Sequence, residues 1–217
     1  MIEIIFPSLG VVLTNIFGLN ILRSYLINRE KLINEYNEIL FYIIIFNVYF
    51  WLFYSIVIKD IFIFFSCISS IIASFGFIQI MYKHMKPEKL IYIESISIIC
   101  LLYLLTIIFL LNFTSIGLYK VQQIVGSSCV VSTITVNITP LLIIKQVITT
   151  QNTDLIYLPQ IFINSINYLC WFIYSTINYN VFLLITNCVS LILCLFQIIV
   201  YVFIRIKINN KILPIVN

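Results

Sequence analysis

Residues 47–55 read NVYFWLFYS, and residues 167–175 read NYLCWFIYS. The two stretches share the pattern N-x-x-x-W-x-x-Y-S at an offset of 120 residues, and each is followed by a polar side chain, Asp60 or Asn180. Any one shared residue would carry no information, but four within nine residues indicate an internal repeat. The chain is therefore expected to contain two copies of one structural unit.

The composition indicates where these copies reside. Of the 217 residues, 62% are hydrophobic and 9% are charged, whereas a soluble domain carries about 25% charged residues. So few charges cannot cover a water-soluble surface, so most of the surface must face lipid. The apolar runs are long and continuous, which favours membrane-spanning helices over a transmembrane barrel.

Hydropathy places seven spans of the length that a membrane helix needs, at residues 4–26, 38–58, 60–82, 89–112, 121–147, 156–178 and 180–204. The predicted fold class is an all-α membrane protein with two parallel three-helix repeats joined by a linker helix (3+1+3). The expected domains are a first three-helix bundle at 1–86, the linker helix at 87–116, and a second three-helix bundle with a short cytosolic tail at 117–217. One linker span gives both triplets the same orientation in the membrane.

The basic residues predict the orientation, because cytoplasmic loops are enriched in Lys and Arg. Two of the 12 fall on one side, Lys59 and Lys120. The other ten fall on the opposite side: Arg23, Arg29, Lys31, Lys83, Lys86, Lys89, Lys145, Arg205, Lys207 and Lys211. We therefore expect the N-terminus outside and the C-terminus in the cytosol. The net charge of +4 arises from these loops and does not indicate nucleic-acid binding.

No pattern predicts covalent chemistry. The six cysteines lie inside predicted spans at no metal-ligand spacing, and we find no nucleophile–base pair and no Gly-rich phosphate loop. The sequence therefore predicts a protein that is not an enzyme and needs no cofactor or metal. Two like bundles that face each other would instead leave an axial cavity, which favours a carrier.

At this level of detail the chain resembles the SWEET family of sugar transporters, which belongs to the wider PQ-loop (MtN3/saliva) group. The resemblance covers nearly the whole chain and is carried by order and spacing more than by any single motif. Its second half contains a "PL…VI-T" stretch, a Pro-Gln dipeptide, a "W-x-x-Y" motif and a "Q…Y" ending, at Pro140–Leu141 with Val147–Thr149, Pro159–Gln160, Trp171–Tyr174, and Gln197 with Tyr201.

The resemblance implies a substrate pocket. Trp171 and Asn187 match pocket residues, Trp51 would form the opposite wall, and Cys67 stands where the family has a second asparagine. An indole packs on the C–H face of a sugar ring, and an amide pairs with its hydroxyls. The alternative for both tryptophans is a packing or interfacial role, and for Asn187 a helix–helix hydrogen bond.

The resemblance also implies moving parts. Tyr54 and Asn180 match the positions where the family closes its outer gate, although the family usually has Asp at the second position. Pro140 and Pro159 match hinge prolines, because a proline frees a backbone carbonyl and allows a kink. The alternative is that both are tolerated kinks without a hinge function.

The spans contain almost no ionisable side chain, and such groups mark proton pathways. We therefore expect facilitated, bidirectional, proton-independent diffusion of a small neutral mono- or disaccharide, with membrane lipid as the other contact and with a homo-oligomer allowed. The plasma membrane is favoured over an organelle. The alternatives are a proton-coupled amino-acid exporter of the PQ-loop group, a sorting receptor of the KDEL-receptor type and a membrane scaffold that transports nothing.

Overall fold

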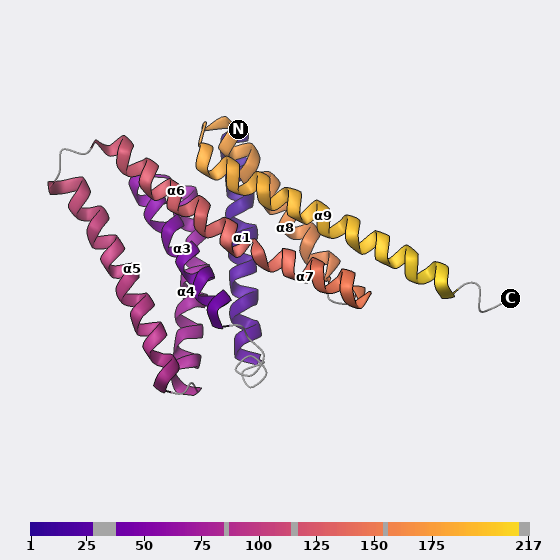
Figure 1. The fold of residues 1–217 in the computed structure, drawn as a ribbon. Coiled ribbons are helices and arrows are strands. Elements are labelled where there is room, and N and C mark those ends of the chain that lie inside the picture. The colour runs from indigo at the N-terminus through magenta and orange to yellow at the C-terminus, as the bar shows by residue number, and fades with distance from the viewer. Residues whose placement is uncertain (28–37, 85–86, 114–116, 154–155, 213–217) are drawn as a thin grey trace. The chain divides into compact units, whose positions relative to one another are not determined.

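The computed structural model describes residues 1–27, 38–84, 87–113, 117–153 and 156–212. Within these ranges every regular element is an α-helix (Figure 1). The helices are α1 (Ile2–Ile27), α3 (Glu38–Ile58), α4 (Ile61–His84), α5 (Pro87–Phe113), α6 (Leu118–Val136), α7 (Ile138–Thr150), α8 (Leu158–Ile177) and α9 (Val181–Ile212). The predicted helical membrane fold is therefore confirmed. Isoleucine-rich segments become helices here because in lipid a helix satisfies every backbone group internally.

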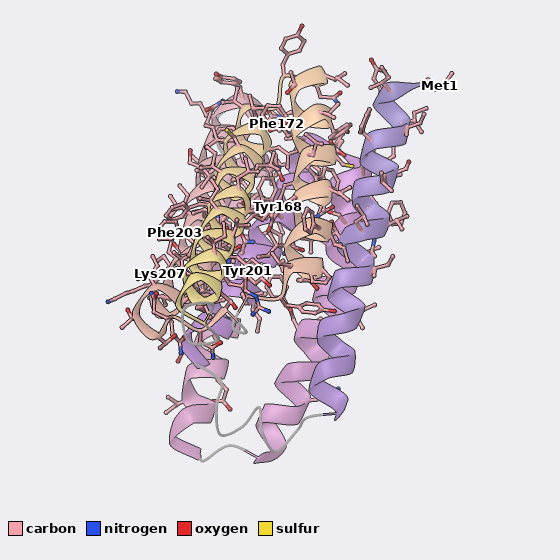
Figure 2. The ribbon with its side chains drawn as sticks, turned by 90° about the vertical axis from the view of Figure 1, so that its right-hand side faces the viewer. Met1, Tyr168, Phe172, Tyr201, Phe203 and Lys207 are labelled. Atoms are coloured by element: carbon pink, nitrogen blue, oxygen red, sulfur yellow. The ribbon has the colours of Figure 1, made fainter. Side chains whose placement is uncertain are left out.

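The predicted spans correspond to these helices with two differences. The fifth span is divided at Asn137 into α6 and α7. The seventh continues to Ile212 as a helix of 32 residues, about 48 Å long at 1.5 Å per residue. A hydrocarbon core is about 30 Å thick, so one end of α9 extends beyond it. Phe203 and Lys207 are both exposed near this end (Figure 2).

Length and hydropathy identify membrane-crossing stretches directly. In the described ranges, Leu118–Thr150 and Val181–Ile208 are long and apolar enough to cross a membrane. Shorter apolar stretches lie in α1, α3, α4 and α5. The distribution of side chains agrees with a lipid environment. On α9, Ile192, Leu195 and Ile199 are exposed, whereas Asn187 and Gln197 are buried, which is the reverse of a soluble helix.

Chain contacts divide the molecule into two compact units, Met1–Val136 and Asn137–Asn217. In the first unit α4 packs against both α1 and α3, and α3 also packs against α6. The linker helix α5 contacts α3 and α6. In the second unit α9 packs against both α7 and α8. In each triplet the third helix therefore contacts the first and the second, as expected of two copies of one unit.

Asparagine side chains join the first and third helices in both units. In the first, Asn15 of α1 donates to the carbonyl of Phe65 at 3.2 Å and accepts from the backbone N–H of Ser69 at 3.3 Å, both on α4. In the second, Asn137 before α7 donates to the hydroxyl of Ser190 on α9 at 3.2 Å. Such interhelical bonds contribute where lipid removes the hydrophobic drive for association.

Candidate functional site

The two copies of the sequence repeat have the same backbone turn. The amide of Asp60 donates to the carbonyl of Ser55 at 2.9 Å, and the amide of Asn180 donates to that of Ser175 at 2.9 Å. Both serines are fully buried, and each hydroxyl donates to the carbonyl three residues earlier, at 2.6 and 2.7 Å. The repeat is thus a structural unit as well as a sequence pattern.

The polar residue after each turn caps the next helix. Asp60 Oδ1 accepts from the backbone N–H groups of Phe62 and Ile63 at 3.0 and 3.1 Å. Asn180 Oδ1 accepts from the N–H of Leu183 at 3.2 Å. A side-chain oxygen at this place satisfies a helix N–H that has no partner inside the helix. Asn180, the predicted gate residue, therefore also has a cap function that the sequence analysis did not assign.

Each repeat presents an aromatic pair in the same geometry. The rings of Trp51 and Tyr54 lie 5.8 Å apart at 85°, and those of Trp171 and Tyr174 lie 5.8 Å apart at 77°. Edge-to-face packing of this kind is favourable beyond the buried area. It orients the indole of each predicted pocket tryptophan against a buried tyrosine. The predicted gate residue Tyr54 is thus a packing partner of Trp51.

In the first unit the indole of Trp51 is also hydrogen-bonded. Its Nε1 donates to the hydroxyl of Thr133 on α6 at 3.0 Å. Thr133 donates in turn to Asn47 Oδ1 at 2.8 Å. The Ser132 hydroxyl lies within hydrogen-bond distance of the same oxygen, at 2.9 Å, and of the carbonyl of Cys129, at 3.0 Å. The sequence repeat singled out Asn47 and Trp51 but missed Thr133 and Ser132, because these lie outside the repeated window. The only sequence signal for them is the run of small polar residues in the fifth span.

In the second unit the predicted pocket residues lie on neighbouring helices. Trp171 on α8 and Asn187 on α9 are both buried, and α8 packs against α9. Asn187 Nδ2 donates to the carbonyl of Leu183 at 2.7 Å. Within the described residues of this unit, its Oδ1 and second N–H have no hydrogen-bond partner. An amide with one open acceptor and one open donor can pair with a ligand hydroxyl.

Cys67 occupies the equivalent place in the first unit, 120 residues before Asn187. Both side chains are 6% exposed, so the substitution changes chemistry and leaves burial unchanged. A thiol is a weak donor and a weak acceptor. The residues before them also match, because Ser66 and Thr186 donate to the carbonyls of Ile63 and Leu183 at 2.7 and 3.0 Å.

The two predicted hinge prolines have different surroundings. Pro140 lies on α7 three residues after Asn137, where the helix is interrupted. Because proline lacks an N–H, the carbonyl of Val136 at the end of α6 has no donor four residues on. Pro159 lies in the first turn of α8, where an N–H would have no intrahelical partner anyway. Only Pro140 therefore removes a bond from the middle of a span.

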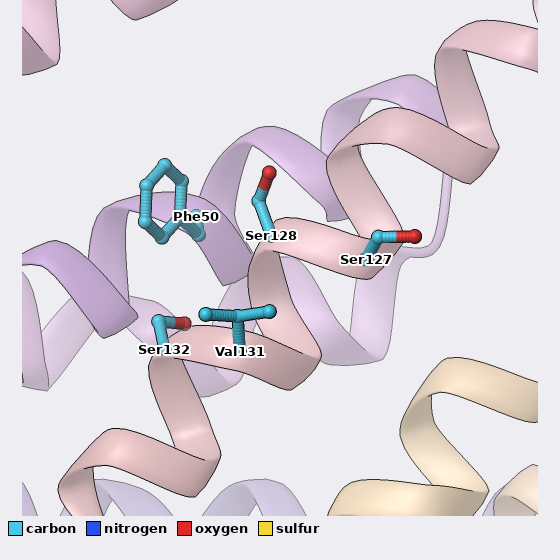
Figure 3. Close-up of a pocket in the computed structure, with 5 residues that line it drawn as sticks. All are labelled: Phe50, Ser127, Ser128, Val131 and Ser132. Atoms are coloured by element: carbon cyan, nitrogen blue, oxygen red, sulfur yellow. The ribbon is translucent and has the colours of Figure 1, made fainter.

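An open hollow of about 330 Å³ lies between α3 and α6 (Figure 3). Its lining is formed by Phe50, Ser127, Ser128, Val131 and Ser132. The hydroxyl of Tyr103 on α5 donates to Ser128 at 3.0 Å, and its ring meets Phe50 at 4.8 Å. None of the eight predicted site residues lines this hollow.

Tyr54 belongs to the first unit and Asn180 to the second, so the predicted gate pair is divided between the units.

Comparison with known proteins finds a similar family and a similar solved structure. Residues 123–209 match the family model described as "Sugar efflux transporter for intercellular exchange". This part of the chain is therefore similar to the SWEET family. A solved structure, "The 3.7 A resolution structure of a eukaryotic SWEET transporter", superposes with a TM-score of 0.78 at 16% identity, covering 94% of this chain and 99% of that one. Among curated proteins no sequence matches.

Both matches support the SWEET resemblance that the sequence predicted. The family-model match covers the second triplet, which is also where the sequence motifs were most complete. The structural match extends the likeness through the first triplet and the linker helix. At 16% identity this second likeness shows the fold and not the substrate.

Proposed function

We propose that this chain is a SWEET-type carrier that moves a small neutral sugar, a mono- or disaccharide, across the membrane by facilitated, bidirectional and proton-independent diffusion. A sugar transporter is what the family match supports. The finer statement rests on the duplicated geometry described above. Two triplets with the same aromatic pair, the same turn and the same helix cap are suited to rock against each other. Alternating access is the mechanism that such a pair of units favours.

The proposed site uses the chemistry of four side chains. The ring face of Trp171 packs against the C–H face of the sugar, while the open amide groups of Asn187 pair with its hydroxyls. Trp51 forms the other wall, and Cys67 contributes a small, weakly polar surface. This division makes the second triplet the stronger contributor of hydrogen bonds, because Asn187 has no amide counterpart in the first.

The proposed gate and hinges follow from the same arrangement. Tyr54 and Asn180 are the outer-gate pair, and Pro140 and Pro159 are the hinges. The structure supports Pro140 more strongly, because its span is interrupted three residues earlier. Asn180 also caps α9, so its movement in a gate would be coupled to the first turn of that helix.

Proton independence is supported by the placement of acidic side chains. Glu3 lies in the first turn of α1, and Asp60 lies between α3 and α4. Glu94 lies two turns into α5 and is exposed. None of these three lies at the middle of a helix, where a coupling carboxylate would be expected. The N-terminus outside, the C-terminus in the cytosol and the plasma membrane complete the proposal.

Sugar entry into liposomes tests this function. Purified protein should admit labelled glucose or sucrose saturably, and a protonophore should leave the rate unchanged. A collapse of solute movement with the protonophore would instead indicate the proton-coupled amino-acid exporter. Binding of an acidic peptide without any solute movement would indicate a receptor of the KDEL-receptor type.

A further inference from the structure

We propose that Thr133 is a positioning residue that holds the Trp51 indole, so that Trp51 meets a sugar with its ring face and not with its N–H. The inference rests on the proposed function, because it assigns Trp51 to the sugar site. It adds a residue from α6, outside the sequence repeat, to the determinants of that site.

The direction of each hydrogen bond is fixed by chemistry. An indole N–H can only donate, so the Thr133 oxygen must accept from Trp51 at 3.0 Å. A hydroxyl has one proton, and Thr133 directs it to Asn47 Oδ1 at 2.8 Å. The relay from Trp51 through Thr133 to Asn47 therefore uses the donor of the indole and the only donor of the threonine.

Thr133 differs from other threonines of this chain. Thr106, Thr135 and Thr176 each donate to the carbonyl four residues earlier in their own helix, all at 2.8 Å. Thr133 directs its proton across the interface between α6 and α3 instead. The Thr133 hydroxyl therefore forgoes a bond to its own helix. It links α6 to a tryptophan and an asparagine on α3 instead.

The indole is constrained on a second side as well. Tyr54 meets it edge to face at 5.8 Å, and the Ser132 hydroxyl lies 2.9 Å from the asparagine oxygen that accepts from Thr133. The repeat counterpart of Thr133 is Leu13, which cannot accept a hydrogen bond. Trp51 of the first triplet is thus held by a hydroxyl from α6, and the other repeat has no hydroxyl at the equivalent sequence position.

Loss of the Thr133 hydroxyl should therefore free the indole. In Thr133→Val the side chain keeps its shape, but the Trp51 N–H loses its acceptor and Asn47 Oδ1 keeps only the Ser132 hydroxyl as a partner. Ordering one mobile side chain on binding reduces affinity by about two- to tenfold. We expect the sugar KM to rise by about that factor while the maximal rate changes less. Thr133→Ser keeps the hydroxyl and should restore the wild-type KM.

The chain has two tryptophans, so an indole ¹⁵N–¹H spectrum of the full-length protein in micelles should show two resonances, assigned with Trp171→Phe. Thr133→Val should move the Trp51 resonance and leave that of Trp171 in place, and Thr133→Ser should move neither far. Thr135→Val is the matched control, because Thr135 lies on the same helix and bonds its own backbone. It should change neither the spectrum nor the KM for labelled glucose or sucrose in liposomes.

The indole spectrum and the sugar KM test different parts of the proposal. An unmoved Trp51 resonance in Thr133→Val would overturn the hydrogen bond, and a moved resonance with an unchanged KM would overturn the positioning role. If the wild type admits neither sugar, the proposed function fails, and the positioning role fails with it even where the resonance moves. A KM that rises equally in Thr135→Val would show a general effect of α6 and would also contradict the proposal.

Discussion

Lys59 and Tyr179 are 120 residues apart and have the same left-handed backbone conformation, with φ of 57° and 54°. Each lies one residue before a helix cap, and each amide donates to the carbonyl three residues earlier, at 3.3 and 3.4 Å. This conformation is disfavoured for residues with a Cβ. Its recurrence at the same repeat position shows that the turn, more than the residue type, is what the two triplets share.

The strain at this turn can be relieved. Tyr179 is 90% exposed, so Tyr179→Gly removes little packing and should raise the free energy of unfolding by about 1 kcal/mol. Asn178→Gly is the control, because Asn178 has a φ of −91° and its side-chain amide donates to the carbonyl of Tyr174. That variant should be less stable than the wild type. Denaturant titration in micelles measures both, and a destabilised Tyr179→Gly would contradict the account of the turn.

The two helix caps should contribute about equally to stability. Asp60→Ala and Asn180→Ala each remove the side-chain oxygen that accepts from the next helix, and each should lower the free energy of unfolding by about 1 kcal/mol. Ser at either position should retain most of that stability. For Asn180, comparing the Ala and Ser variants distinguishes a capping role from a gate role. Asn180→Ser keeps the side-chain oxygen that caps the helix but loses the amide group. Altered sugar movement in a fully stable Asn180→Ser would support the gate, and wild-type movement would contradict it.

Pro140 is the stronger of the two proposed hinges. Pro140→Ala restores an N–H donor for the carbonyl of Val136 and should favour a continuous helix through Asn137. We expect stability to be unchanged or higher. The initial rate of sugar entry should fall about tenfold, which corresponds to roughly 1.4 kcal/mol on the barrier. Pro159→Ala is the comparison and should have the smaller effect, because Pro159 removes no intrahelical bond. Equal rates for Pro140→Ala and the wild type would remove the hinge role.

The sequence was sufficient for the parts that depend on local pattern. Apolar length located the helices, and the repeat located both tryptophan–tyrosine pairs and both turns. The helix cap at Asn180 was missed, because the family resemblance assigned this residue to the gate and its local role at the start of a helix was not considered. Pro140 gave an indirect signal of the helix break at Asn137. The break lies next to Val136, whose carbonyl has no donor because of the proline, and not at the proline itself.

The contacts between helices were beyond the sequence. Thr133 and Ser132 reach Asn47 only because α6 packs on α3 with a particular rotation, and nothing in a single apolar span fixes that rotation. The residues chosen for the pocket came from the family resemblance, and their roles stay predictions. Cys67 shows what each source contributes. The sequence shows that the first triplet lacks the amide, and the structure adds that the Cys67 thiol is as buried as the Asn187 side chain.

The most direct test is the entry of labelled glucose and sucrose into liposomes that contain the wild type, Trp171→Ala or Asn187→Ala, with and without an imposed pH gradient. The account predicts saturable entry through the wild type that ignores the pH gradient. It also predicts that entry is lost in both variants although each inserts and folds. No entry of either sugar through folded wild-type protein, or undiminished entry through Trp171→Ala, would contradict it.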